Sequence, residues 1–246
     1  MRFKQMATVL ALAGVGFVGS VHADETFDIH VGMAQIIPKG SAGFNQAQSL
    51  DVGNSLQYNS SKSLSVDLSF QSADSRFGIN YLPMKFSSSK IFPTAVALAG
   101  TTFNAGTPVN SELNVDVWDI NYTSYVLNVD DLPSRLRIGV EGAVKWVPGT
   151  FVLNNGVAAN QTTAATMIPT LGLRAATGLS DFVGLSGHVS YGGERYFESD
   201  FRADYSPLPM VGVYGGYRSM HLFIDRPVLY VKATFSGFYM GAFARF

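Results

Sequence analysis

The chain has 246 residues, of which 47% are hydrophobic and only 14% are charged, and it contains 25 glycines and no cysteine. Soluble domains carry about 25% charged residues, so this composition argues against an ordinary water-soluble protein. The formal net charge of −1 lacks the basic excess of a nucleic-acid-binding protein, and no nucleic-acid partner is expected.

The first 23 residues have the pattern of a secretory signal peptide. Arg2 and Lys4 precede an apolar stretch from about residue 7 to residue 18, and Val21-His22-Ala23 fits a signal peptidase site. An anchoring first helix is the alternative. We expect residues 1–23 to be a cleaved signal peptide and residues 24–246 to form one domain, which without cysteine must be stabilised by something other than disulfides.

The rest of the chain alternates with a period of two, the signature of β-strands. In "SLSVDLSF" (63–70), leucine, valine and phenylalanine alternate with serine and aspartate, so apolar and polar side chains lie on opposite faces. The same pattern predicts ten strands, at about 27–34, 63–70, 76–85, 113–127, 135–146, 167–176, 182–191, 197–205, 211–218 and 231–246.

The segments between these strands alternate between long and short. Residues 38–61, 87–112 and 148–165 are long and polar, whereas "QSADS", "NVDDLPS" and "TGLSD" are short. Barrels of the outer membrane have short periplasmic turns and longer external loops. A soluble sandwich would need more charge on its outer faces. The sequence therefore predicts a transmembrane antiparallel up-and-down β-barrel of ten strands in the bacterial outer membrane, with eight or twelve strands as alternatives.

The end of the chain supports the same fold. Counting back from Phe246 in steps of two gives an apolar face on the last strand, through Ala244, Ala242, Met240 and Phe238. A terminal aromatic residue on such a face resembles the signal by which outer-membrane proteins are recognised by their assembly machinery. We expect Phe246 to be that assembly signal and to lie in the periplasmic aromatic girdle.

The last 35 or so residues also resemble a family. The stretches "GVYGGYRSMHLFID" and "VKATFSGFYMGAFARF" are similar to the closing hairpin of small Gram-negative outer-membrane β-barrel proteins of uncharacterised function. The family pattern falls on Gly216, Tyr217, Arg218, Met220, Phe235, Gly237, Gly241 and Phe246. The resemblance implies the fold and the compartment, and it implies no activity.

The polar faces of the strands predict what fills the barrel. The inward set is Asp28, His30, Asp67, Arg76, Asp119, Asn121, Arg137, Glu141, Lys145, Arg174, His188, Arg202, Asp204 and Arg218. Opposite charges in a narrow lumen pair with one another and fill the space. If the lumen conducts instead, the expected lining is Arg137, Glu141, Lys145, Arg174, His188 and Arg218.

Two arrangements suggest chemistry, and neither is complete. His188 and Ser190 lie two residues apart, and lipid A deacylases of the outer membrane have a similar His-x-Ser arrangement; their active site faces lipid, however, and the asparagine after the serine is Tyr191 here. Outer-membrane aspartyl-type proteases use acidic pairs and an Asp-His pair at the external rim, which His221 and Asp225 resemble only faintly.

These observations lead to a function without catalysis. We expect no catalytic residue, cofactor or metal site, because the sequence has no cysteine and no His/Asp cluster at ligand spacing. The expected partners are outer-membrane lipids, lipopolysaccharide and the assembly machinery. The leading hypothesis is a structural or surface-interaction protein; the alternatives are a narrow, porin-like pore or small-solute binder and a lipid A-modifying hydrolase.

Overall fold

Ten long strands form the molecule. The computed structural model describes residues 26–93, 95–98, 101–129, 135–180, 182–208 and 210–246. The long strands are β1 (Thr26–Gly43), β3 (Ser61–Gln71), β4 (Ser75–Ile91), β7 (Pro108–Val129), β8 (Leu136–Asn154), β9 (Ala159–Gly178), β10 (Val183–Tyr191), β11 (Tyr196–Leu208), β12 (Val211–Arg226) and β13 (Leu229–Arg245). The shorter elements are η1 (Gln46–Gln48), β2 (Ser49–Asp51), β5 (Val96–Leu98) and β6 (Thr101–Phe103).

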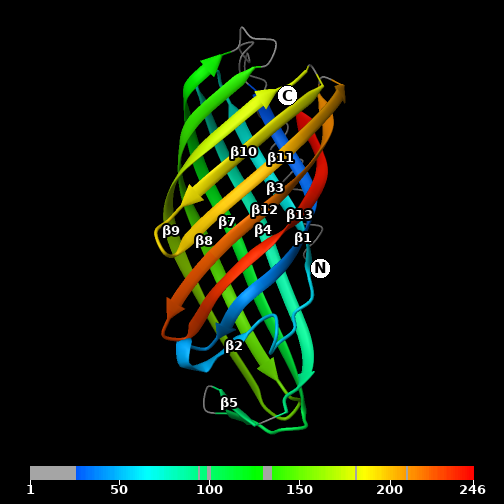
Figure 1. Cartoon of the computed structure of the whole chain (residues 1–246), viewed down its shortest axis with the longest axis vertical. Helices are drawn as coiled ribbons and strands as arrows, with labels where there is room; N and C mark the ends of the chain where they lie inside the picture. Colours follow the sequence, from blue (N-terminus) through cyan, green and yellow to red (C-terminus); the bar gives the residue numbers. More distant parts are fainter. Residues whose placement is uncertain (1–25, 94, 99–100, 130–134, 181, 209) are drawn as a thin grey trace.

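The strands close into an antiparallel barrel (Figure 1). Each long strand pairs with the next one along the chain, and β13 returns to β1 from Asp28↔Arg245 to Gly43↔Tyr230. The predicted ten-strand up-and-down barrel is confirmed. The expected signal peptide at residues 1–23 lies outside the described residues. No helix in the described ranges is long and apolar enough to cross a membrane.

Strand β7 shows how the sequence produces two different environments along one barrel. Its odd-numbered residues face inward and its even-numbered residues face outward along most of the strand. The outward residues Trp118, Ile120 and Tyr122 are apolar, whereas the outward residues from Asn110 to Asp116 are polar. On the inward face the order is opposite: Leu113, Val115 and Val117 are apolar, and Asp119, Asn121 and Thr123 are polar. The two faces exchange polarity between residues 117 and 118.

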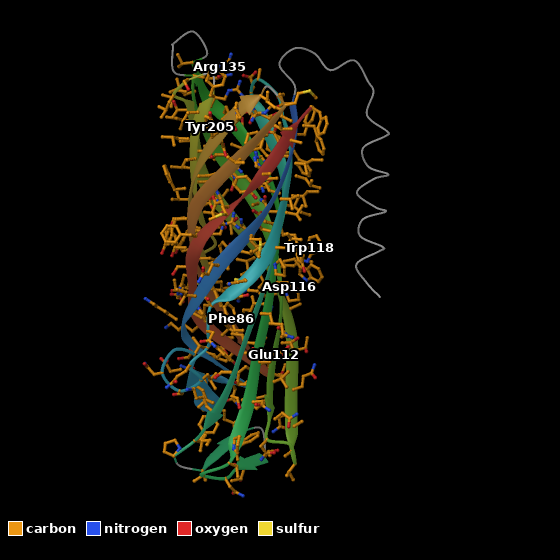
Figure 2. The ribbon with its side chains drawn as sticks, turned by 90° about the vertical axis from the view of Figure 1, so that its right-hand side faces the viewer. Phe86, Glu112, Asp116, Trp118, Arg135 and Tyr205 are labelled. Atoms are coloured by element: carbon orange, nitrogen blue, oxygen red, sulfur yellow. The ribbon has the colours of Figure 1, made fainter. Side chains whose placement is uncertain are left out.

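The part of the barrel with apolar residues outside is the membrane-spanning part. These residues form a lipid-facing belt that includes Val31, Leu64, Ile120, Val140, Trp146, Leu171, Val189, Phe201, Tyr217 and Met240, all exposed on the outer wall. Figure 2 shows Trp118 at the edge of this belt, with Asp116 and Glu112 beyond it and Tyr205 near the opposite end. The ring of Trp118 stacks on Tyr81 at 4.2 Å between ring centroids. Such an outer band bordered by aromatic residues is the pattern of an outer-membrane barrel.

Beyond the belt, four strands continue into water. This outer extension consists of residues 83–91 of β4, 108–116 of β7, 148–154 of β8 and 159–165 of β9. Its interior is apolar, and Phe86, Leu113, Phe151 and Leu153 are almost completely buried. It is therefore built like a sheet of a water-soluble protein, with a polar outer face and an apolar inner face.

The prediction that these segments are external loops was wrong in part. Much of the segments 87–112 and 148–165, and the start of 38–61, is strand rather than loop. Their polar residues still alternate with apolar ones, but here the polar side faces out and the apolar side packs inward. Serine, threonine and asparagine are common in loops, so composition alone concealed the strands.

The two described ends of the barrel wall are held together at the periplasmic end. Phe27 N donates to Phe246 O at 3.0 Å, and Phe246 N donates to Phe27 O at 2.9 Å. The Phe246 side chain is 59% exposed on the outer wall. This places the terminal residue beside β1, and its place in an aromatic girdle and its role as an assembly signal stay predictions.

Candidate functional site

A buried lysine lies at the centre of the lumen. Lys145, on β8, is 0% exposed. Its Nζ donates to Asp119 Oδ2 at 2.6 Å and to Glu198 Oε2 at 3.2 Å. These carboxylates come from β7 and β11, so one ammonium group ties together distant parts of the wall. A buried charge of this kind is tolerated only when it is paired and hydrogen-bonded.

Glu198 connects this lysine to a second group of charges. Tyr196 Oη donates to Glu198 Oε2 at 2.7 Å, and Arg218 Nε lies 3.2 Å from Glu198 Oε1. Arg218 also donates to Asp200 Oδ2 at 2.8 Å, and Tyr239 Oη donates to Asp200 Oδ1 at 2.7 Å. Five strands, β7, β8, β11, β12 and β13, thus meet through one polar network.

The network continues toward the periplasm through arginines. Arg174 donates to Glu141 Oε2 from both Nε (2.7 Å) and Nη2 (2.5 Å). Arg76 Nη2 lies 3.2 Å from Asp67 Oδ1, and Arg202 Nη1 lies 3.6 Å from Asp67 Oδ2. Because each guanidinium has a carboxylate partner, the charges in this part of the lumen are largely compensated within the protein.

The structure places the predicted lumen residues at two levels. In the middle of the barrel, Glu198 lies close to Lys145, His188 and Arg218. Arg174, which is opposite His188 in the β9–β10 register, pairs with Glu141. Arg137 lies apart, near the periplasmic mouth, where its Nε donates to Asn128 Oδ1 at 3.3 Å.

Two carboxylates of this network were missing from the predicted inward set. Glu198 and Asp200 are inward residues of β11, and Phe197 and Phe201, on either side of them in the sequence, face lipid. The alternation in "FESDFRAD" predicts that both carboxylates face inward, because the same pattern placed Arg202 and Asp204 inward. Extending it from Arg202 toward the N-terminus, by two and then by four residues, would have identified both.

The His188 and Ser190 pair lies inside the wall rather than at its lipid face. Both side chains are buried, while Val189 and Tyr191 between and beside them are exposed on the belt. His188 Nε2 is 3.7 Å from Glu198 Oε1, and no hydrogen-bond partner is within reach of Ser190 Oγ. A lipid acyl group in the membrane would have to pass through the wall to reach this serine.

The other suggested pair lies on the outer surface. His221 belongs to the outward face of β12, and its Nδ1 is 3.2 Å from Thr234 Oγ1 on β13. Asp225 is exposed farther along the same strand. Within the described ranges, no group of three or more His, Asp or Glu residues is arranged to hold a metal ion.

Apolar side chains fill the lumen above the polar network. Phe86, Phe235, Leu113 and Leu222 point into the outer half of the barrel, and each is at most 1% exposed. The segment between β2 and β3 folds into the same core, where Tyr58 packs against Phe86 with ring centroids 6.2 Å apart. The interior is thus filled by charges at one level and by hydrocarbon at the next.

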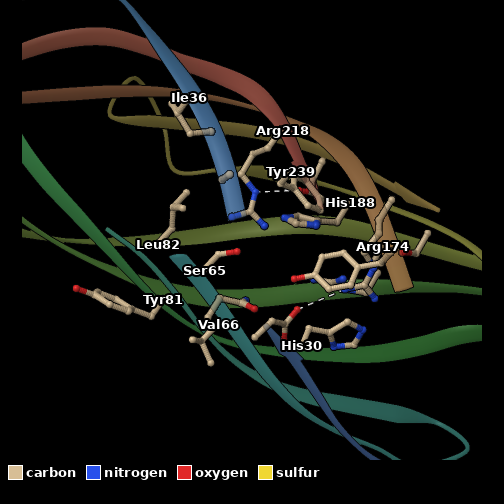
Figure 3. Close-up of a pocket in the computed structure, with 18 residues that line it drawn as sticks. His30, Ile36, Ser65, Val66, Tyr81, Leu82, Arg174, His188, Arg218 and Tyr239 are labelled. Atoms are coloured by element: carbon tan, nitrogen blue, oxygen red, sulfur yellow. Dashed lines mark hydrogen bonds and ion pairs between the residues drawn. The ribbon is translucent and has the colours of Figure 1, made fainter. Parts of the chain in front are cut away.

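Two spaces remain beside these fillings. A cavity of about 50 Å³ lies where the polar and apolar levels meet, bordered by His30, Ile36, Leu82, Arg218 and Tyr239 (Figure 3). A larger open pocket of about 460 Å³ lies at the periplasmic mouth, with Asp28, Arg76, Arg137, Arg202 and Arg245 among its lining residues.

The outer extension contains a carboxyl group whose pKa is lowered. Glu112, on the outer extension, accepts a hydrogen bond from Asn114 Nδ2 at 2.6 Å and lies 2.9 Å from Lys85 Nζ. The hydrogen bond and then the lysine hold the pKa of this carboxyl below its ordinary value. A lowered folded-state pKa stabilises the protein above the unfolded pKa, and this contribution disappears as pH falls through the folded pKa.

We therefore expect Glu112→Gln to have a small, pH-dependent effect. At pH 7 it should lower the free energy of unfolding by less than about 1 kcal/mol, because the pair is partly exposed. In urea titrations at falling pH, the difference between the variant and the wild type should shrink below the ordinary glutamate pKa and vanish once the carboxyl is protonated in both the folded and the unfolded state. An equal difference at neutral and at acidic pH would contradict this electrostatic origin.

Comparison with known proteins identifies the architecture. No family model matches the sequence, and no curated protein matches it significantly. Among solved structures, the outer membrane protease OmpT from Escherichia coli has a TM-score of 0.52 at 13% identity, covering 93% of this chain and 98% of OmpT.

Two further solved structures match with lower TM-scores. They are Ail, the attachment invasion locus protein of Yersinia pestis (TM-score 0.41, 8% identity, 91% and 99% covered), and Neisserial surface protein A (TM-score 0.37, 13% identity, 89% and 97% covered). The closed sheet, the lipid-facing belt and the likeness to OmpT establish that this chain is a ten-stranded β-barrel protein of the Gram-negative outer membrane.

Proposed function

We propose that the protein is a non-enzymatic outer-membrane scaffold whose outer extension presents a rigid surface for interactions outside the cell. The observation that carries this proposal is the filling of the interior at two successive levels. Lys145 and its carboxylates occupy the middle of the lumen, and Phe86, Phe235 and neighbouring apolar residues occupy the outer half. A barrel filled in this way supports a surface role better than it supports conduction.

The outer extension has the properties of a presented surface. Its strands are paired continuously, from Pro83↔Asp116 to Ile91↔Pro108 between β4 and β7 and from Pro148↔Ala165 to Asn154↔Ala159 between β8 and β9. Because its core is apolar and buried, its outward polar residues are held on a folded support rather than on long loops. Such preorganisation reduces the entropy that binding a partner would cost.

Planar bilayer recordings test the filled interior. Purified wild-type protein should give no stepwise conductance at any applied voltage, since charged and apolar side chains fill the cross-section. Regular steps whose ion preference changes in the Arg174→Glu variant would overturn the proposal in favour of a narrow pore.

The absence of lipid A hydrolysis needs its own measurement. Mass spectra of lipid A from cells expressing the wild type should match those from the empty strain and from cells expressing Ser190→Ala. A new lipid A species that is present with the wild type and lost with Ser190→Ala would establish a hydrolase.

A second candidate function is binding of a small solute from the periplasmic side. The pocket of about 460 Å³ at the periplasmic mouth favours it, because Arg76, Arg137, Arg202 and Arg245 border an open space there. Calorimetric titration with small carboxylates would test it. Binding that is lost in Arg137→Gln would support this candidate, and the absence of heat would remove it.

A further inference from the structure

One seam in the barrel wall is open over part of its length. Strands β3 and β4 pair from Gln71↔Arg76 to Val66↔Tyr81 and no farther. Beyond that point β3 still pairs with β1 as far as Ser61, and β4 still pairs with β7 as far as Ile91. The two strands therefore continue side by side without a ladder between them.

Pro83 explains where the ladder stops. Ser72 N donates to Ser75 O, which places residues 72 and 75 in a hydrogen-bonded pair. Hydrogen-bonded pairs recur at every second residue of an antiparallel ladder, so the series continues through 70/77, 68/79 and 66/81. The next pair would join Leu64 to Pro83, and proline has no N–H to donate.

The opening is limited above and below. Its lower edge is the pair Val66↔Tyr81. At its upper edge, Lys85 N donates to Ser61 Oγ at 3.1 Å and holds the strands together again. We call residues 62–65 of β3 and 82–84 of β4, which border this opening, the β3–β4 window.

The cavity of about 50 Å³ extends to this window. Its lining includes the inward residues Asp67 and Asn80 and the outward residues Val66 and Tyr81. In Figure 3, Ser65, Val66, Tyr81 and Leu82 lie together on one side of the cavity, opposite Arg218 and Tyr239. The cavity therefore reaches the barrel wall at the window.

The window lies at the level of lipid head groups. Tyr81, at its lower edge, is opposite Trp118 at the border of the belt, and Pro83 is opposite Asp116 in the polar region. Leu64 is 46% exposed on the outer wall. The opening thus begins where hydrocarbon ends, which is the level of lipid phosphates and glycerol groups.

Lysines surround the window on the outer wall. Lys62 and Lys85 are exposed on β3 and β4, on opposite sides of the opening, and Lys39 is exposed on neighbouring β1. Lys85 lies 2.9 Å from Glu112, and Asp116 is opposite Pro83; these two carboxylates still leave the group of three lysines with a net positive charge. On β8 and β9, the outward residues just beyond the belt, such as Pro148, Thr150, Ala165 and Thr163, are uncharged. The positive charge is therefore concentrated beside the window.

We propose that the β3–β4 window binds a phosphorylated lipid of the outer leaflet, with its phosphate between Lys62 and Lys85 and its adjoining apolar groups against Leu64 and Tyr81. Each lysine near an anionic lipid surface favours binding. The unpaired backbone at Leu64 also needs polar partners at this depth, because unsatisfied backbone groups are costly near hydrocarbon. This inference does not depend on the proposed surface function.

Cysteine labelling tests whether the window is open to lipid. The chain has no cysteine, so Ser65→Cys and Ser69→Cys each introduce a single thiol. Both serines face inward on β3, but Ser69 lies where the ladder to β4 is intact, opposite Gly78. In vesicles containing a phosphatidylethanolamine with a maleimide on its head group, Ser65→Cys should be labelled and Ser69→Cys should not.

The proline provides a second variant for the same test. Adding Pro83→Val restores the missing N–H, so the ladder should extend and labelling of Ser65→Cys should be suppressed. Equal labelling of the two serine positions, or labelling by a water-soluble maleimide alone, would overturn the window.

Lipid retention tests the lysines. Native mass spectrometry of protein released from vesicles of phosphatidylcholine and phosphatidylglycerol should show bound phosphatidylglycerol in the wild type. Loss of each lysine should weaken retention about fivefold, so Lys62→Gln/Lys85→Gln should lose most of it. Lys232→Gln, an exposed lysine on β13, should retain the lipid like the wild type. Unchanged retention in the double variant, or an equal loss in the control, would contradict the site.

Discussion

Replacing Lys145 with methionine is expected to lower the free energy of unfolding by about 3–5 kcal/mol, because it leaves two buried carboxylates without their shared cation. Asp119 would lose its 2.6 Å partner, and Glu198 would lose one of several partners. Methionine fills nearly the same volume, so the loss reflects charge rather than packing. Urea unfolding of the protein refolded into lipid vesicles would measure it.

Two further variants test whether the loss of stability comes from the buried position of the Lys145 charge. Lys232→Met removes an exposed lysine and should change stability by less than about 0.5 kcal/mol. The double variant Lys145→Met/Asp119→Asn should recover part of the loss, since Glu198 keeps Tyr196 and Arg218 as partners. If Lys145→Met unfolds at the same urea concentration as the wild type, the lysine does not stabilise the network.

The second large effect is expected on the outer wall of β9. Leu171 is 71% exposed in the belt, and arginine there should cost about 2–4 kcal/mol, as for charges on the lipid face near the membrane centre. Gln161 is exposed on the same face of the same strand, but in the outer extension. Gln161→Arg should be close to neutral, because that face is in water.

The difference in stability cost between Leu171→Arg and Gln161→Arg tests the position of the membrane boundary. Both place the same side chain on one strand at positions of the same parity, so differences in strand propensity largely cancel. Equal costs at the two positions, measured by the same unfolding experiment, would mean that the polarity change along β9 does not mark a membrane boundary.

Alternation made most of the architecture predictable. A stretch such as "SLSVDLSF" fixes which side chains face outward without any knowledge of its neighbours, and the charges opposite the apolar residues then belong inside. The lumen positions of Glu141, Lys145 and Arg174 follow from this rule alone. Their pairing does not, because contacts such as Lys145 to Glu198 depend on how the barrel closes.

The outer extension and the β3–β4 window could not be predicted from the sequence, because both depend on the tertiary structure. In β7 the alternation continues unbroken past Trp118, but its meaning changes when the surroundings change from lipid to water. Residues 108–112 therefore resembled a polar loop. Pro83 is visible in the sequence, yet its effect appears only when the register shows that its missing N–H faces β3 rather than β7.

Spin labels along the outward face of β7 test the central arrangement most directly. Labels at Asn110 and Asn114 should be relaxed by a water-soluble nickel complex, and labels at Ile120, Tyr122 and Val126 should be relaxed by oxygen dissolved in the lipid, with the change falling between residues 116 and 118. Access of the nickel complex to all five positions would contradict a barrel that stands half in lipid and half in water.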